Sequence, residues 1–93
     1  MKLEELYKII ENRKKNMPAG SYVASLFRGD SDRIIQKIGE EATEVIIAAK
    51  NDNKQRQIEE ITDLVFHLLI LMAKQGIKLE NIYKELNKRH IPK

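Results

Sequence analysis

Apolar residues recur every three or four positions along most of this chain, which is the spacing of helices that bury one face. The pattern predicts a first helix from about Lys2 to Arg13, whose apolar stripe is Leu3, Leu6, Tyr7 and Ile10. A second helix is expected to begin at a cap formed by Asp30 or Ser31 and to end near Lys50. Its apolar stripe consists of Ile34, Ile35, Ile38, Ala42, Val45, Ile46 and Ala49.

A polar turn at residues 51–54 follows, and Asp52 or Asn53 can cap the third helix. Because the turn is short, the third helix should run antiparallel to the second. Gly76 is suited to end the third helix, since glycine readily adopts the left-handed conformation of a helix C-cap. The fourth helix ends in basic residues before Pro92, and its apolar positions are Leu79, Ile82, Tyr83 and Leu86.

The third helix is apolar around most of its circumference between residues 64 and 73, where His67 is the only polar residue. We expect His67 to be a hydrogen-bonded core residue rather than a ligand. Three other short helices of one chain can hardly cover such a helix, so a second copy of the chain is expected to cover it. The sequence therefore predicts an all-α fold: a four-helix bundle-like chain with two long antiparallel central helices, assembled as a homodimer.

The connection between the first two helices, residues 17–30, is long for a small domain and contains two aromatic residues. Loops of this length are usually functional or disordered, and the aromatic residues argue against disorder. Two interpretations remain open. Either Tyr22, Leu26 and Phe27 plug the open end of the bundle, or the segment faces a ligand.

Two carboxylate pairs, Glu41 with Glu44 and Glu60 with Asp63, lie on helices that should face each other. Glu41 falls within the apolar stripe of its helix, where a charged group needs a partner. Four carboxylates gathered at one point repel one another unless a cation joins them. We therefore predict a divalent metal site, whose all-oxygen ligands indicate Mg²⁺ with Mn²⁺ as a substitute. The alternative is that all four are ordinary charged residues of a helix surface.

Charged residues of both signs are mixed along the chain: 17 Lys and Arg against 14 Asp and Glu give a net charge of +3. Because the basic residues are spread along the chain among acidic ones, without a concentrated basic arm, no nucleic-acid partner is expected. The chain has no cysteine, which fits a reducing compartment, and its first residues lack the apolar run of a signal peptide. We expect one domain of 93 residues, located in the cytoplasm and without a membrane partner.

Several segments together resemble one enzyme family. The two carboxylate pairs, separated by fifteen residues, are similar to the metal motif of the all-α nucleotide pyrophosphatase superfamily, which includes MazG and the dimeric dUTPases. Residues 20–27, 32–44 and 63–69, with Arg89 and His90, extend the resemblance to the phosphoribosyl-ATP pyrophosphatases of histidine biosynthesis. Phe66 stands where that family is expected to have Tyr. Residues 1–93 are therefore expected to form a single domain of this type.

The resemblance implies hydrolysis of phosphoribosyl-ATP to phosphoribosyl-AMP and pyrophosphate, the second step of histidine biosynthesis. The metal-binding catalytic residues would be Glu41, Glu44, Glu60 and Asp63. The bound Mg²⁺ would hold phosphate oxygens and lower the pKa of a water. Basic and hydroxyl side chains nearby would bind the small-molecule nucleotide, and the candidates are Lys37, Arg33, Arg28, Ser21, Tyr22 and Ser25.

Two other functions remain open. The chain could be a housecleaning nucleoside triphosphate pyrophosphatase of the MazG type, or a non-enzymatic helical dimerisation module. Residues 21–27 favour the histidine-pathway enzyme over the housecleaning one. The carboxylates argue against a mere scaffold, because a scaffold gains nothing from buried like charges.

Overall fold

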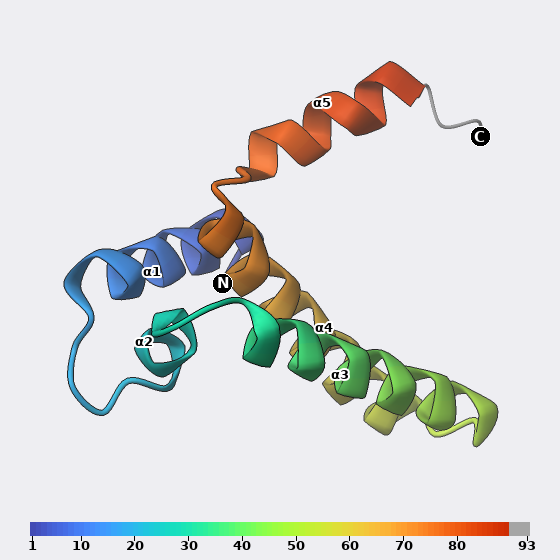
Figure 1. The fold of residues 1–93 in the computed structure, drawn as a ribbon. Helices are drawn as coiled ribbons and strands as arrows, with labels where there is room; N and C mark the ends of the chain where they lie inside the picture. The colour runs from blue at the N-terminus through green and yellow to red at the C-terminus, as the bar shows by residue number, and fades with distance from the viewer. Residues whose placement is uncertain (90–93) are drawn as a thin grey trace.

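Five helices make up the computed structural model of this chain, which describes residues 1–89 (Figure 1). Their bounds are α1 (Leu3–Asn16), α2 (Tyr22–Phe27), α3 (Asp32–Lys50), α4 (Lys54–Gln75) and α5 (Leu79–Arg89). These 89 residues contain no strand, so the predicted all-α class is confirmed. The predicted helix count of four was wrong, because residues 22–27 form a short helix instead of an irregular loop. The expected end of the last helix at His90 and Pro92 lies outside the described residues.

The helix ends follow the local chemistry of the sequence. Asn53 caps α4 by accepting a hydrogen bond on its Oδ1 from the backbone N–H of Arg56, at 3.0 Å. At the start of α3 it is Asp30, rather than Ser31, whose side chain accepts a bond from the backbone, here from the N–H of Asp32. Gly76 ends α4 in the left-handed conformation, with φ of 75°, as glycine at that position predicts.

The longest helices, α3 and α4, lie side by side and antiparallel, joined by the short turn at residues 51–53 (Figure 1). Helices α1 and α2 pack against the end of this pair that is far from the turn. The core forms there, and its buried members are Tyr7, Ile10, Leu26, Phe27, Ile34, Leu69, Ile70 and Ala73. Leu26 and Phe27 therefore plug the core, whereas Tyr22 from the same segment is exposed.

The end of the pair near the turn has no such cover within residues 1–89. Large apolar side chains are exposed there on both helices, namely Ile46, Ile47, Ile58 and Ile61. Apolar surface of this kind on two neighbouring helices is typical of a surface that another protein covers.

Helix α5 projects away from the other helices and buries none of its residues (Figure 1). Polar contacts hold it to α1. The hydroxyl of Tyr83 donates to Glu4 Oε1 at 2.8 Å, and Lys78 Nζ donates to Glu11 Oε2 at 2.5 Å. The bond to Glu11 raises the pKa of the Lys78 ammonium group. These polar contacts are exposed and contribute little, while Leu79 at the start of α5 packs against the core.

Two lysine side chains donate hydrogen bonds to backbone carbonyl oxygens of other segments. Lys74 Nζ on α4 donates to the carbonyl oxygens of Phe27 at 3.0 Å and Gly29 at 2.6 Å, and so fixes the segment that follows α2. Lys14 Nζ donates to the carbonyl oxygen of Ala73 at 2.7 Å, near the C-terminus of α4. Within residues 1–89, no helix combines the length and the apolar character that a membrane span requires.

Candidate metal centre

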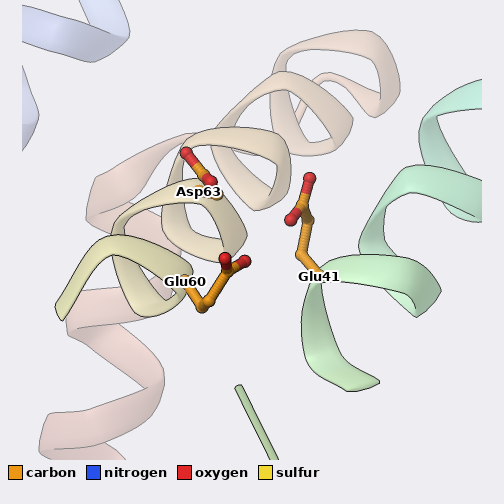
Figure 2. Close-up of side chains that lie close together, drawn as sticks. All are labelled: Glu41, Glu60 and Asp63. Carbon is orange, nitrogen blue, oxygen red and sulfur yellow. The ribbon is translucent and has the colours of Figure 1, made fainter. Parts of the chain in front are cut away.

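Three carboxylates meet where α3 faces α4 (Figure 2). Glu41 reaches from α3, and Glu60 and Asp63 come from successive turns of α4. One ligand oxygen from each residue lies within 4.8 Å of the other two. Glu60 is buried, Glu41 is partly buried and Asp63 is exposed, so the cluster is open to solvent on one side.

The geometry of the cluster fits a small hard cation. Mg²⁺ binds carboxylate oxygens at about 2.1 Å, so two oxygens on opposite sides of the ion lie about 4.2 Å apart. Adjacent ligands lie only about 3.0 Å apart, and at most one pair among three ligands can be opposite, so the three oxygens, now within 4.8 Å of one another, would have to draw together around the ion by side-chain movement. All donors are oxygens, which suits Mg²⁺ or Mn²⁺ better than a softer metal.

Glu44, the fourth predicted ligand, is not among the residues that meet in this cluster. It is exposed and lies three residues after Glu41, which turns its direction by about 60° around the helix axis. Its side chain lines a separate hollow of about 300 Å³ beside the turn, with Ile47, Ala48, Asn51, Asn53 and Arg56. The role of Glu44 as a metal ligand beside the other three carboxylates stays a prediction.

Arg56 is a charged residue of this region that the sequence reasoning missed. Its Nη2 lies 2.8 Å from Glu60 Oε1, and the Glu60 side chain is only 8% exposed. A buried carboxylate needs such a partner, because burial without a counter-charge is strongly unfavourable. The signal in the sequence was the spacing: Arg56 stands one helical turn before Glu60.

His67 is buried and links the cluster to α2. Its Nδ1 lies 2.9 Å from the backbone oxygen of Asp63, and its Nε2 lies 2.8 Å from the hydroxyl of Tyr22. Because a carbonyl oxygen can only accept, the neutral ring carries its proton on Nδ1 and accepts the Tyr22 hydroxyl at Nε2. His67 is thus a hydrogen-bonded core residue, as expected, and Nδ1 also lies 3.7 Å from Glu41 Oε1.

The other predicted substrate-binding residues lie in α2, at its two ends and in the first half of α3. Lys37 is half-buried with its Nζ 4.0 Å from Glu40, whereas Arg28 and Arg33 are exposed. The two serines already have partners: Ser21 Oγ accepts the N–H of Ala24, and Ser25 Oγ donates to the carbonyl oxygen of Tyr22. These contacts stabilise α2, and the role of all five side chains toward a nucleotide stays a prediction.

Comparison with known proteins shows which family the chain belongs to. The family described as Phosphoribosyl-ATP pyrophosphohydrolase matches residues 3–90. The chain belongs to that family. The resemblance inferred from the carboxylate pairs and residues 20–27 is therefore confirmed.

Individual relatives agree with the family assignment. The chain is 57% identical to a phosphoribosyl-ATP pyrophosphatase of Leptospira biflexa, over 97% of this chain and 95% of the relative. It is 52% identical to the protein of the same name from Clostridium acetobutylicum, over 95% of this chain and 80% of that one. It is also 51% identical to a histidine biosynthesis bifunctional protein HisIE of Oceanobacillus iheyensis, where the match spans 90% of this chain and 39% of the longer protein.

Proposed function

We propose that this chain is a metal-dependent phosphoribosyl-ATP pyrophosphatase, acting at the second step of histidine biosynthesis. The observation that carries the proposal is the cluster of Glu41, Glu60 and Asp63, in a chain 57% identical to a relative named for that activity. Family membership favours this reaction over the housecleaning and scaffold alternatives.

The carboxylates supply the chemistry that such a hydrolysis needs. Water adds to the α phosphorus, the bond from that phosphorus to the bridging oxygen breaks, and pyrophosphate leaves. Glu41, Glu60 and Asp63 would hold a Mg²⁺, which when bound offsets phosphate charge and lowers the pKa of a water. Glu44 is the proposed fourth ligand, since its exposed side chain is free to turn. A carboxylate of the cluster takes the proton of the attacking water.

Substrate recognition is assigned to α2 and the start of α3. Lys37, Arg33 and Arg28 are proposed to bind phosphates, and the exposed Tyr22 to contact the base or sugar. The hydrogen bond from Tyr22 to the buried His67 fixes the tyrosine beside the carboxylates, which supports this assignment. Ser21 and Ser25 would contribute through the shape of α2 and their remaining lone pairs.

The test is pyrophosphate release from matched concentrations of phosphoribosyl-ATP, ATP and dCTP with Mg²⁺ present. Phosphoribosyl-ATP should be hydrolysed far faster than either triphosphate, because its extra phosphoribosyl group offers more contacts. Excess EDTA should abolish the activity. Equal or faster hydrolysis of ATP or dCTP would assign the chain to the housecleaning class instead.

A variant pair refines the substrate assignment. Losing one hydrogen bond to a charged group lowers specificity by about one to two powers of ten. Arg28→Ala is therefore expected to reduce kcat/KM for phosphoribosyl-ATP by about 10- to 100-fold while Mn²⁺ affinity stays unchanged, and Ser25→Ala to reduce it less. Arg13→Ala, which removes an equal charge from α1, is the matched control and should behave as wild type.

The proposed active form is a homodimer in which α3 and α4 of each chain are the central helices. The exposed isoleucines near the turn support this assembly, together with Leu68, which is 40% exposed in the middle of α4. An apolar groove of about 400 Å³ between α4 and α5 adds further uncovered surface, lined by Val65, Leu68, Leu69, Leu71, Met72, Gln75, Ile77, Leu79 and Ile82. A cytoplasmic location stays a prediction from the sequence.

A further inference from the structure

Arg56 forms an ion pair with a buried acidic residue, while much of its own side chain is exposed to solvent. Its Nη2 lies 2.8 Å from Glu60, whose side chain is 8% exposed, while the Arg56 side chain itself is 52% exposed. Its Nη1 lies 3.4 Å from Glu59, which is exposed. Only one end of the arginine is therefore held by the protein interior, and rotation of its side chain can release Glu60 without disturbing the core.

A divalent ion bound in the cluster would weaken the electrostatic attraction between Arg56 and Glu60. Glu60 would then share its negative charge with the ion, and the guanidinium would face a second positive charge a few ångströms away. Even with the dielectric constant of bulk water, repulsion between two unit positive charges about 4 Å apart alters an affinity by a factor of about five. Arg56 thus stabilises the chain without metal and opposes metal binding.

Once released from Glu60, the Arg56 guanidinium would have space to bind another anion. The side chain borders the 300 Å³ hollow beside the turn, whose other polar lining residues are Glu44, Asn51 and Asn53. A guanidinium binds phosphate through two parallel hydrogen bonds, a geometry that a single ammonium group cannot match. The proposed substrate brings phosphates to the cluster together with the metal.

We propose that Arg56 is an exchangeable counter-ion, which neutralises Glu60 in the metal-free chain and transfers to a phosphate of the metal-bound substrate. The inference rests on the proposed function, since it requires the metal to bind at the carboxylate cluster. It predicts that removing the charge of Arg56 has opposite effects on two affinities: the metal alone binds more tightly, and a metal-bound polyphosphate binds less tightly.

The experiment compares wild type with Arg56→Gln in two titrations. Mn²⁺ alone is titrated by electron paramagnetic resonance, and the non-hydrolysable methylenebisphosphonate is titrated by calorimetry at saturating Mg²⁺. In Arg56→Gln, Mn²⁺ should bind about three- to tenfold more tightly, and the bisphosphonate about ten- to a hundredfold less tightly. Unchanged or weaker Mn²⁺ binding, or an unchanged bisphosphonate affinity, overturns the exchange.

Three further variants separate the possible causes. Lys78→Gln breaks a different ion pair, with Glu11 on α1 at 2.5 Å, whose cation is as exposed as Arg56, and should leave both affinities at wild-type values. Arg56→Lys keeps the charge and should keep the wild-type Mn²⁺ affinity; tightening equal to that of Arg56→Gln would overturn the electrostatic cause. Glu60→Gln tests the metal site itself. If wild type binds no Mn²⁺, or Glu60→Gln binds it equally well, the proposed function fails rather than the role of Arg56 alone.

Discussion

The two ends of the α3–α4 pair are built from similar residues but differ in the solvent exposure of their apolar side chains. At the end far from the turn, α1 and α2 cover the pair, and Ile34 and Ile70 are completely buried. At the end near the turn, Ile46 is 59% exposed and Ile58 is 54% exposed. Both ends carry β-branched aliphatic residues at helical spacing, so the difference comes from the elements packed against them.

The acidic cluster lies between these two environments. His67, one turn after Asp63 on α4, is buried at the covered end, whereas Arg56, one turn before Glu60, is largely solvent-exposed. The two ends therefore supply different neighbours to the carboxylates: a buried ring nitrogen 3.7 Å from Glu41 at the covered end, and a half-exposed guanidinium 2.8 Å from Glu60 at the bare end. The proposed second copy of the chain on the bare end would enclose the site further, and activity would then depend on assembly.

The largest effect is expected from a charge on the uncovered surface. Leu68→Lys should convert a dimer into a monomer at micromolar concentration, since an unpaired buried charge weakens association by about 3 to 5 kcal/mol. Sedimentation velocity measures the change, and circular dichroism checks that the helices persist. Ile9→Lys places the same charge at an exposed site on α1 and serves as the control. A wild-type chain that is a stable monomer at this concentration would contradict the proposed dimer.

A truncation in the covered core should have the next largest effect. Ile34→Ala removes a side chain that is 0% exposed and should lower the free energy of unfolding by about 2 to 5 kcal/mol. Chemical denaturation measures this loss, which should not depend on protein concentration because the residue packs within one chain. A loss below about 1 kcal/mol would mean that the core at this end can collapse around the missing atoms.

The cluster between the two ends gives the third prediction. Asp63→Asn should lower metal-dependent turnover by at least about 100-fold, because one ligand charge is lost. Glu44→Gln should lower turnover by about 10-fold or more if Glu44 turns to join the site. Both variants should be as stable as wild type without metal, or more stable, since like charges are removed. Wild-type turnover in Asp63→Asn would refute the assignment of the cluster.

The smallest effect concerns the exposed attachment of α5 to α1. The hydrogen bond from Tyr83 holds the pKa of Glu4 below its ordinary value of 4.5. A carboxyl group whose pKa is lower in the folded state adds stability above its unfolded pKa, and this stability is lost as the pH falls through the folded value. The midpoint of thermal unfolding of Tyr83→Phe should therefore lie slightly below that of wild type at pH 7. The difference should shrink as the pH falls below 4.5, and a difference that keeps its full size in acid would contradict the role of Glu4.

Much of the fold could be predicted because its helices are strongly periodic and their ends carry clear caps. Asn53 and Gly76 marked the two ends of α4, and the stripe through Ile34 and Ile38 defined α3. Helix α2 could not be predicted in the same way, because six residues are too few to display a period. It is held by contacts from afar, such as the ammonium group of Lys74.

The site was predictable to the extent that it depends on helix geometry. The spacing of Glu60 and Asp63, and the place of Glu41 in an apolar stripe, brought these three together. The hydrogen bond between Tyr22 and His67 could not be predicted, because it joins residues 45 positions apart and local periodicity does not depend on it. The separation of Glu44 from the cluster depends on side-chain rotation, which a helical pattern does not fix.

The short turn between α3 and α4 has a consequence for the order in which the molecule folds. Contacts between residues close in sequence form early, since little chain entropy is lost in closing a short loop. All three carboxylates lie on this one hairpin, so their meeting should precede the docking of α1, whose partners on α4 are more than fifty residues away. Pulse-labelled hydrogen exchange should show protection in α3 and α4 before α1. On a ribosome, the catalytic centre would then take shape before the last helix has emerged.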